Sequence, residues 1–421
     1  MFATISQIFK PSNKDLRHRV LFTLAILSIF CIGTNITVPW ANAITKELGF
    51  LELFNLMAGG GLKQFSIFAL GVTPYITATI ITQLLQMDII PYFSELKEQG
   101  YVGKQKINKI NRYLGILFAF VQGYAISIAF LGTKDVNSIL KTTLVLTAGT
   151  SLLMWLGDQI TQKGIGNGVS LLIFTGIVSN LPNAFLTTYD NLVTYDSGMW
   201  LDIAWYVLFV VVYLSIVVFV VFTEGAIRKI PVNYASSTSV TMRTREQTHM
   251  PIKINSSGVL PVIFASSVLA APRTIVSFMK ASSTTKMINT IFNYQEPVGF
   301  CLYILMIIGF TFFYSNLQID AEKISDDLKK NGGSIPGVRT GIETKNFIKR
   351  VLNQVTVAGS LTLCIIAAIP IITPIIWTQT ENANLSLGGT GLIIVTGVAL
   401  ETVKQIKTYI TRKEYHGYIR K

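Results

Sequence analysis

The chain has 421 residues, of which half are hydrophobic and only 14% are charged. A soluble globular protein of this size has too little interior to bury so many apolar residues, so the composition excludes that class and favours a chain that crosses a membrane several times. The formal net charge of +13 would suggest a nucleic-acid partner for a soluble protein, but in a membrane protein it is first a signal of orientation.

The first 19 residues are basic and polar, and no short apolar run with a small-residue cleavage site follows them. We expect this stretch to be a cytosolic tail and not a cleaved signal peptide.

Ten apolar runs are long enough to cross a bilayer, which takes roughly 17–25 residues. An even number of spans places both ends of the chain on one side, and that side would carry 28 of the 35 lysines and arginines. The positive-inside rule therefore predicts cytosolic N and C termini. The runs lie at 20–40, 65–87, 113–132, 138–156, 168–187, 203–223, 257–279, 298–316, 351–376 and 386–403.

The approach to the second run is unusual for a spanning helix. Three glycines at 59–61 and Lys63 stand where the helix should begin, and Pro74 follows inside the apolar part. The seventh run carries a similar glycine and a proline, Pro261, near its start. Matched interruptions in two halves of five spans, which must face opposite ways, are typical of an inverted repeat around a central pathway. The alternative is that glycine and proline are simply common in spanning helices.

Two cytosolic loops, 224–256 and 317–350, are longer than orientation requires and carry basic and turn-forming residues. They suggest docking surfaces for a partner that is acidic or contains RNA, although a plain orientation signal is the alternative.

The spans offer little chemistry of their own. No ionisable group lies near mid-membrane, and the polar residues that stand out inside spans are Gln83 and Gln122. The sequence has no Walker motif, no nucleophile–base pair and no metal-ligand spacing, and its three cysteines lie far apart in apolar runs. These features favour a passive conduit driven by a partner. A secondary transporter or flippase stays open, and an intramembrane enzyme would need a catalytic dyad or metal motif.

Several motifs, in a fixed order from about residue 20 to residue 415, resemble the SecY family, the channel-forming subunits of the bacterial or plastid Sec preprotein translocase. They are "FSIFALGVTPYITATIITQLLQ", "GIGNG", "VNYA", "GVLPVIFASS", "DDLKKNGGSIPGVRTG" and "GGTGLIIV". The resemblance implies an all-α polytopic membrane protein with ten transmembrane helices in two inverted five-helix halves around a central pore. It implies a protein-conducting channel that passes unfolded preproteins across the membrane and releases transmembrane segments sideways into lipid. It implies no enzyme activity and no cofactor. An accessory SecY with restricted substrates is a narrower alternative.

The resemblance also implies partners and a location. The partners would be SecE, SecG, the SecA ATPase, the ribosome, preproteins and signal peptides, with nucleic acid contacted only through ribosomal RNA. The chain would lie in the plasma (inner) membrane, or in the thylakoid membrane if it comes from a plastid. Its parts would be the tail 1–19, a first half 20–187 with a plug at 50–63, an external loop and helix six at 188–223, a docking loop 224–256, helices seven and eight at 257–316, a docking loop 317–350, helices nine and ten at 351–403, and the tail 404–421.

The same resemblance assigns roles to individual residues. A short plug helix at 50–57 would be joined to the second span by a flexible glycine joint, with the span itself beginning near Phe65 and Lys63 exposed to water. The plug and its joint would comprise Phe54, Asn55, Gly59, Gly60 and Gly61. A lateral gate would comprise Thr77, Gln83, Gln122, Ser266 and Ser267.

A constriction of six apolar side chains would close the pore. Its residues would be Ile76, Ile80, Val169, Ile173, Ile263 and Ile394; the first four form two pairs with i, i+4 spacing, so each pair shares a helix face. Partner docking would use Arg228, Lys229, Lys329, Lys330 and Arg339. Thr340 departs from the family pattern, which has a proline after that arginine.

Overall fold

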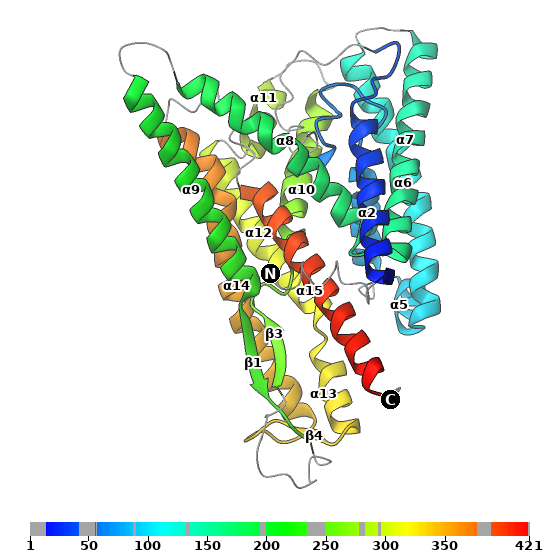
Figure 1. Cartoon of the computed structure of the whole chain (residues 1–421), viewed down its shortest axis with the longest axis vertical. Helices are drawn as coiled ribbons and strands as arrows, with labels where there is room; N and C mark the ends of the chain where they lie inside the picture. Colours follow the sequence, from blue (N-terminus) through cyan, green and yellow to red (C-terminus); the bar gives the residue numbers. More distant parts are fainter. Residues whose placement is uncertain are drawn as a thin grey trace. The chain divides into compact units, whose positions relative to one another are not determined.

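The computed structural model describes residues 14–41, 55, 57–86, 90–131, 135–193, 199–234, 249–277, 283–293, 296–376 and 389–419. The chain forms two compact units, Met1–Thr187 with Glu401–Lys421, and Thr188–Leu400. Each unit is built largely from long helices (Figure 1). Helices α8 (Gly168–Leu192) and α15 (Gly389–Ile419) each contribute residues to both units.

The first unit holds the N-terminal helices. Besides the beginning of α8 and the end of α15, its elements are α2 (Lys14–Thr34), α4 (Thr73–Leu85), α5 (Pro91–Glu98), α6 (Tyr101–Phe130) and α7 (Val136–Lys163).

In its described residues, the second unit combines further helices with four short strands. Besides parts of α8 and α15, its elements are α9 (Met199–Gly225), β1 (Ile227–Pro231), β2 (Asn233–Tyr234), β3 (His249–Lys253), α10 (Leu260–Ser277), α11 (Ser283–Phe292), α12 (Pro297–Gln318), α13 (Ala321–Lys330), β4 (Gly333–Ser334) and α14 (Ile342–Ile376).

Each of the ten predicted runs overlaps a helix. Within the described ranges, seven helices are long and apolar enough to cross a membrane: α2, α6, α7, α8, α9, α12 and α14. The other three predicted runs correspond to α4, α10 and α15.

The second span differs from the prediction because its helix begins at Thr73 and not near Phe65. Phe65 has a φ of 50° and Gly71 a φ of 56°, values that an α-helix cannot contain. Pro74 occupies the first turn of α4, where a missing N–H costs nothing. Residues 58–72 therefore form turns ahead of a helix of only 13 residues.

The turns at 58–72 are packed inside the first unit. Leu62 and Phe65 are buried, and the backbone pairs with the stretch after α2, since the amide of Val38 donates to the Phe65 carbonyl and the amide of Ile67 donates to the Ile36 carbonyl. Irregular backbone is tolerated at membrane depth where protein surrounds it and its polar groups find partners.

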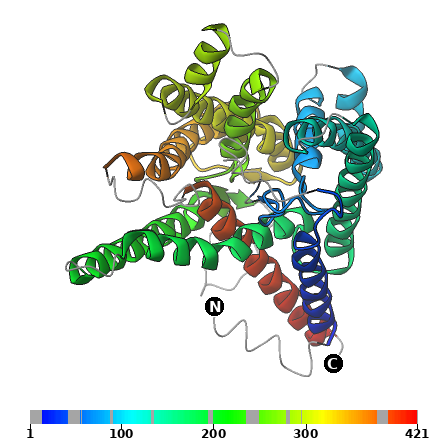
Figure 2. The same cartoon turned by 90° about the horizontal axis from the view of Figure 1, so that it is seen from above.

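A stripe of mostly small residues on α6 lets its neighbours approach closely. The Cα of Tyr75 on α4 lies 3.4 Å from the point where a Cβ on Gly115 would stand. A glycine on the neighbouring helix has the same effect, because the Ile67 carbonyl, in the turns at 58–72, packs directly against Gly149 of α7. Helices α6 and α7 run side by side in both views (Figures 1 and 2). Small residues at such seams allow tight helix packing in membranes. The buried stripe comprises Gly103, Ile107, Asn111, Gly115, Ala119, Gly123 and Ser127.

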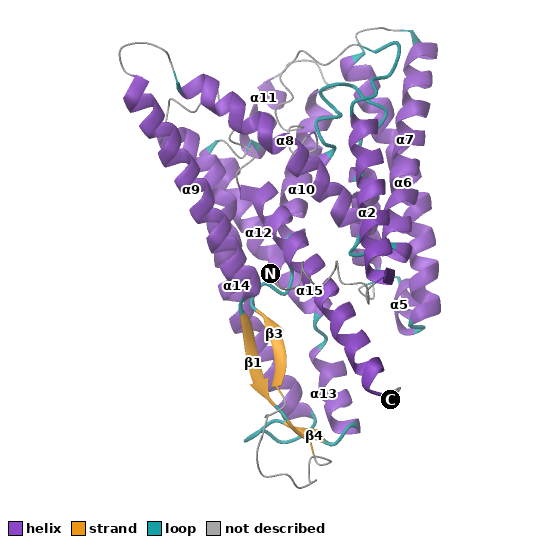
Figure 3. Ribbon diagram, viewed as in Figure 1, coloured by secondary structure: helices purple, strands orange, loops and turns teal. Residues whose placement is uncertain are grey.

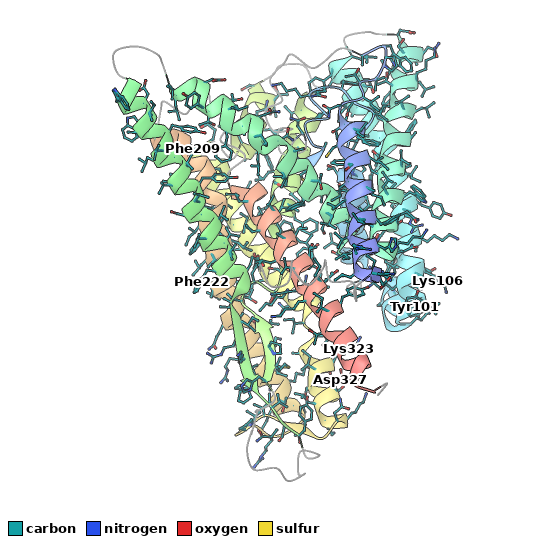
Figure 4. All side chains as sticks on the ribbon, in the orientation of Figure 1. Tyr101, Lys106, Phe209, Phe222, Lys323 and Asp327 are labelled. Atoms are coloured by element: carbon teal, nitrogen blue, oxygen red, sulfur yellow. The ribbon has the colours of Figure 1, made fainter. Side chains whose placement is uncertain are left out.

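The second unit is organised around α12. Its buried residues Tyr303 and Ile307 share an apolar cluster with residues of α10, α14 and α15. Helix α9 is peripheral: Phe209 is 7% exposed but Phe222 is 76% exposed and lies on the outer side of the helix (Figure 4). An apolar helix with this much exposed surface is suited to contact lipid.

The four strands were not predicted from the sequence. They form two antiparallel pairs, β1 with β3 and β2 with β4, at the end of the second unit that also holds α13 (Figure 3). In the first pair Arg228 is opposite Ile252 and Ile230 is opposite Met250; in the second, Asn233 is opposite Ser334.

Candidate functional site

The two predicted docking loops fold together as one module of the second unit. Strands β1 and β3 come from the first loop, while α13 and β4 come from the second, and β2 pairs with β4 to join the loops directly. A shared core holds them on the first turns of α14. Its buried residues are Ile230, Val232, Ile252, Leu328, Ile335, Ile348, Val351, Leu352 and Val355.

The β1–β3 pair separates the two basic residues that the sequence placed together. Successive side chains of a strand point to opposite faces, so Arg228 shares its face with Ile230, which is buried in the core, and Lys229 lies on the other face. On that second face Lys229 has Lys253 and His249 beside it, all exposed.

Sequence reasoning did not group Lys253 and His249 with Lys229, although all three share one exposed face of the β1–β3 pair. The available signal was the alternation in "IRKIP" and "HMPIK", where one isoleucine in each segment is buried and its neighbours are exposed. In each segment the alternation covers only five residues, which is too short to distinguish a strand from a loop by pattern alone.

The second loop presents its predicted docking residues in two places. Lys329 and Lys330 are exposed in the last turn of α13, where basic side chains are favourable for the helix dipole. Arg339 and Thr340 are exposed in the turn that leads into α14, and the φ values of Gly337 (79°) and Gly341 (103°) give this turn its shape.

Side-chain hydrogen bonds fix the turn around Arg339. The Thr344 hydroxyl donates to the Arg339 carbonyl over 2.8 Å, and the Ser325 hydroxyl on α13 donates to the Gly341 carbonyl over 2.8 Å. A salt bridge of 2.6 Å joins Lys345 on α14 to Glu322 on α13. The turn is therefore held by both helices although position 340 lacks a proline.

The outer face of α13 is charged but not uniformly basic. Lys323 and Asp327 are exposed there (Figure 4), and the first turn contains Glu322. The exposed basic residues of the module therefore lie mainly on β1, β3, the end of α13 and the turn at Arg339.

Four of the predicted constriction residues belong to the first unit. Ile76 and Ile80 are half-buried on one face of α4, and Val169 and Ile173 lie on one face of α8. Val169 also touches α7, because its Cγ2 lies 3.3 Å from the point where a Cβ on Gly157 would stand. A side chain at Val169 is thus positioned by the α7–α8 packing.

The remaining two, Ile263 and Ile394, are buried in the second unit on α10 and α15. A Cβ on Gly397 would lie 3.4 Å from Cγ2 of Val259, and Leu392 belongs to the same apolar cluster as Val262. Residues 392–397 of α15 therefore lie beside residues 259–262 at the beginning of α10, and the two isoleucines lie in or next to these stretches. The roles of all six residues stay predictions.

The predicted gate residues are distributed over α4, α6 and α10. The hydroxyl of Thr77 donates to the Thr73 carbonyl, and the hydroxyl of Ser266 donates to the Ile263 carbonyl, so both are satisfied within their own helices. Gln83 lies on α4 and Gln122 on α6; Ser267 lies on α10, with a side chain outside the described part of the structure.

Backbone hydrogen bonds connect the glycine joint to Asn55. Phe54 and most of the predicted plug helix 50–57 lie outside the described residues. Asn55 is described, and its Oδ1 accepts a hydrogen bond from the Lys63 amide over 2.9 Å. The amide of Gly60 donates to the Asn55 carbonyl over 2.8 Å. Lys63 is exposed on the surface of the chain, and its contact with water stays a prediction.

Each glycine of the joint is needed for a definite reason. Gly59 and Gly60 have φ values of 68° and 79°, which favour glycine. A Cβ on Gly61 would lie 2.6 Å from the Ser66 hydroxyl oxygen, so lack of space, and not the backbone angle, requires glycine there.

Over the ranges that the structure describes, no three His, Cys, Asp or Glu side chains are grouped to hold a metal ion.

Comparison with known proteins identifies a matching family and similar relatives. The family model described as SecY matches residues 66–403. The chain is 42% identical over 434 residues to "Protein translocase subunit SecY" of Bacillus subtilis (strain 168), with 100% of both chains covered.

Two solved structures share the fold. "The structure of a protein conducting channel" has a TM-score of 0.64 at 17% identity, covering 93% of this chain and 92% of that one. "Sec61 in the Canine ribosome-channel complex from the endoplasmic reticulum" has a TM-score of 0.61 at 17% identity, with the same coverage.

Proposed function

The chain belongs to the SecY family of protein translocase subunits, and we propose that it acts as the protein-conducting channel of a Sec translocon. In this role it passes unfolded preproteins across the membrane and releases transmembrane segments sideways into lipid. The observation that carries the proposal is the match to a SecY translocase subunit over the full length of both chains, on a fold shared with a protein-conducting channel.

The fold itself is the all-α polytopic fold of this channel family, with ten transmembrane helices in two inverted halves around a pore. For this chain we propose that Ile76, Ile80, Val169, Ile173, Ile263 and Ile394 form the constriction. A narrow apolar ring loses its water and raises the barrier to hydrated ions. Branched side chains can still move apart around an extended polypeptide.

We propose that the module built from β1, β3, α13 and β4 receives cytosolic partners. Its exposed bases, Lys229, Lys253 and Arg339 among them, suit an acidic protein surface or the phosphates of ribosomal RNA. The Sec61 structure is described as a ribosome–channel complex, which supports a ribosome as one partner. SecA, SecE and SecG are the other proposed partners, in a plasma membrane with both termini cytosolic.

Arg339→Glu tests the docking role. Because Arg339 is exposed and its backbone, not its side chain, makes the local hydrogen bond, the change should leave folding intact and reverse one charge of the docking surface. We expect loss of SecA-driven translocation with normal membrane insertion of the chain. Lys323→Glu, on the outer face of α13, is the matched control. Normal export by the Arg339→Glu variant would remove this residue from the docking surface.

Reconstitution tests the function as a whole. Proteoliposomes that contain the chain with its small partner subunits should protect a preprotein from external protease when SecA and ATP are supplied, and only if the preprotein has an intact signal peptide. Transport of a small solute without SecA, together with no protection of preprotein, would instead identify a secondary transporter or flippase.

A further inference from the structure

We propose that Gln405 of α15 is a positioning residue for the constriction. Together with Thr23 of α2 it holds the α7–α8 loop, residues 164–167, and thereby fixes the beginning of α8, where Val169 lies. The proposal rests on the function proposed above and assigns a role within it to a residue that does not line the ring. All of these residues belong to the first unit.

The end of α15 holds the loop from one side. Oε1 of Gln405 accepts a hydrogen bond from the Gly166 amide over 3.0 Å. A Cβ built on Gly166 would lie 3.5 Å from the hydroxyl oxygen of Thr402, about one turn earlier on α15. Gly166 has a φ of 89°, a conformation that favours glycine. Gln405 therefore satisfies a backbone donor that lies between two helices and belongs to neither.

Helix α2 holds the loop through the preceding amide. The Thr23 hydroxyl accepts a hydrogen bond from the Ile165 amide over 3.1 Å and donates to the Arg19 carbonyl over 2.8 Å. Thr23 is 7% exposed, and a Cβ built on Gly164 would lie 2.5 Å from its hydroxyl oxygen. Two successive amides of the loop thus have their acceptors on two different helices, which restrains the loop more than either acceptor would alone.

A small apolar cluster joins the same three elements. Its centre is Ile165, which is 3% exposed. The buried members are Leu16, Ile165 and Ile410, with Val20 and Ile406 packed against them. Outside the cluster, the guanidinium of Arg19 on α2 lies 5.5 Å from the ring centroid of Tyr409 on α15, a favourable cation–π distance. The two helices are therefore held to each other as well as to the loop.

The loop passes directly into the first turn of α8. Oδ1 of Asn167 accepts a hydrogen bond from the Val169 amide over 3.2 Å, as an N-cap residue does. The Gly168 amide donates to the Thr161 hydroxyl on α7 over 2.9 Å, and the Gly168 backbone packs against the Gly157 carbonyl. The beginning of α8 is thus fixed by the loop and by α7.

Val169 and Ile173 follow the held loop closely. Val169 is three residues after Gly166, and Ile173 is one turn further along the same face of α8. Since the turns of a helix are joined by hydrogen bonds, a displacement of the loop is carried to both side chains. Loss of the Gln405 acceptor should therefore loosen the proposed ring, and a looser ring admits water and ions.

Two substitutions at Gln405 separate the hydrogen bond from mere packing. Gln405→Leu removes the acceptor at similar size, whereas Gln405→Glu keeps an acceptor oxygen. We expect Gln405→Leu to speed hydrogen exchange of residues 164–167, to raise the conductance of the idle channel in a planar bilayer severalfold, and to allow translocation of a preprotein with a defective signal peptide. Gln405→Glu should match the unsubstituted chain in all three measurements.

A control on the same helix and a second pair on α2 complete the design. Thr408 is exposed, and its hydroxyl donates to the Lys404 carbonyl within α15, so Thr408→Leu should change none of the three measurements. If Gln405→Leu does not fold, Thr23→Val and Thr23→Ser repeat the comparison from the α2 side, because valine lacks the acceptor that serine keeps.

The outcomes distinguish this proposal from the proposed function. Unchanged exchange of the loop in the variants without an acceptor, faster exchange without greater conductance, or equal effects of Gln405→Leu and Gln405→Glu would each overturn the positioning role. Failure of the unsubstituted chain to translocate a preprotein when SecA and ATP are supplied would instead count against the channel function.

Discussion

Asp135 shows how one side chain sets the beginning of a spanning helix. It precedes α7, and its carboxylate accepts hydrogen bonds from the Asn137 amide over 3.3 Å, the Ser138 amide over 3.2 Å and the Ser138 hydroxyl over 2.7 Å. This is an N-cap that satisfies donors which the helix itself cannot. The Ser138 hydroxyl first, and then the two amides, hold the pKa of Asp135 below its ordinary value.

A pH dependence follows from this lowered pKa. A carboxyl with a lower pKa in the folded than in the unfolded state stabilises the folded state above the unfolded-state pKa, and this contribution is lost as pH falls through the folded-state pKa. Asp135→Ala should therefore lower the thermal unfolding midpoint in detergent at neutral pH. The difference from the unsubstituted chain should narrow below about pH 3.9. A difference that does not depend on pH would show that the charge of the cap is irrelevant.

The proposed constriction can be tested by measuring ion leak through variants of its residues. Ile76→Asn combined with Ile394→Asn should let water into a ring that is otherwise apolar, and thereby increase ion leak and relax the requirement for a signal peptide. The matched control is Ile76→Leu with Ile394→Leu, which keeps the apolar character. Conductance across a planar bilayer measures the leak. Equal conductance for the two pairs would remove these residues from the constriction.

Helix periodicity placed several predicted site residues on helices correctly. The spacing of Ile76 with Ile80 and of Val169 with Ile173 predicts shared faces, and both pairs do lie on helices. It failed where the backbone leaves the helix. Apolar content suggested a helix from Phe65, but Phe65 itself has a positive φ, and hydropathy contains no information on backbone angles.

Among the elements, the docking loops departed furthest from expectation. Charge and turn-forming residues predicted two exposed cytosolic loops, whereas the structure shows a module with its own apolar core and the pairing of β2 with β4. Strands of two residues, as β2 and β4 are, have no detectable period, and their pairing joins segments about 100 residues apart. Neither could be read from local pattern.

The module's core makes a prediction of its own. Ile348 on α14 is fully buried between the two loops, and its truncation to alanine should cost about 2–5 kcal/mol in the stability of the module. Ile342→Ala on the same helix, at a residue 78% exposed, is the control and should cost little. Hydrogen exchange of β1 and β3 is the measurement. Equal protection in both variants would mean that the loops do not depend on this core.

For the molecule as a whole, composition and the number of long apolar runs predicted the class correctly. Ten apolar runs correspond to ten helices, and the fold is that of the SecY channel family. Hydrophobic length is a strong signal because a lipid bilayer imposes it. Motif resemblance, and not periodicity, supplied the family, since helices of a channel and of a transporter obey the same physical rules.

Conditional depletion of the chain in its host, followed over time by measurement of precursor accumulation, distinguishes the general channel from the other roles. A channel of general secretion predicts that many signal-peptide-bearing precursors accumulate together, soon after depletion and before growth stops. Accumulation of only a few precursors would indicate an accessory channel with restricted substrates. Normal processing of every precursor in depleted cells would contradict the proposed function.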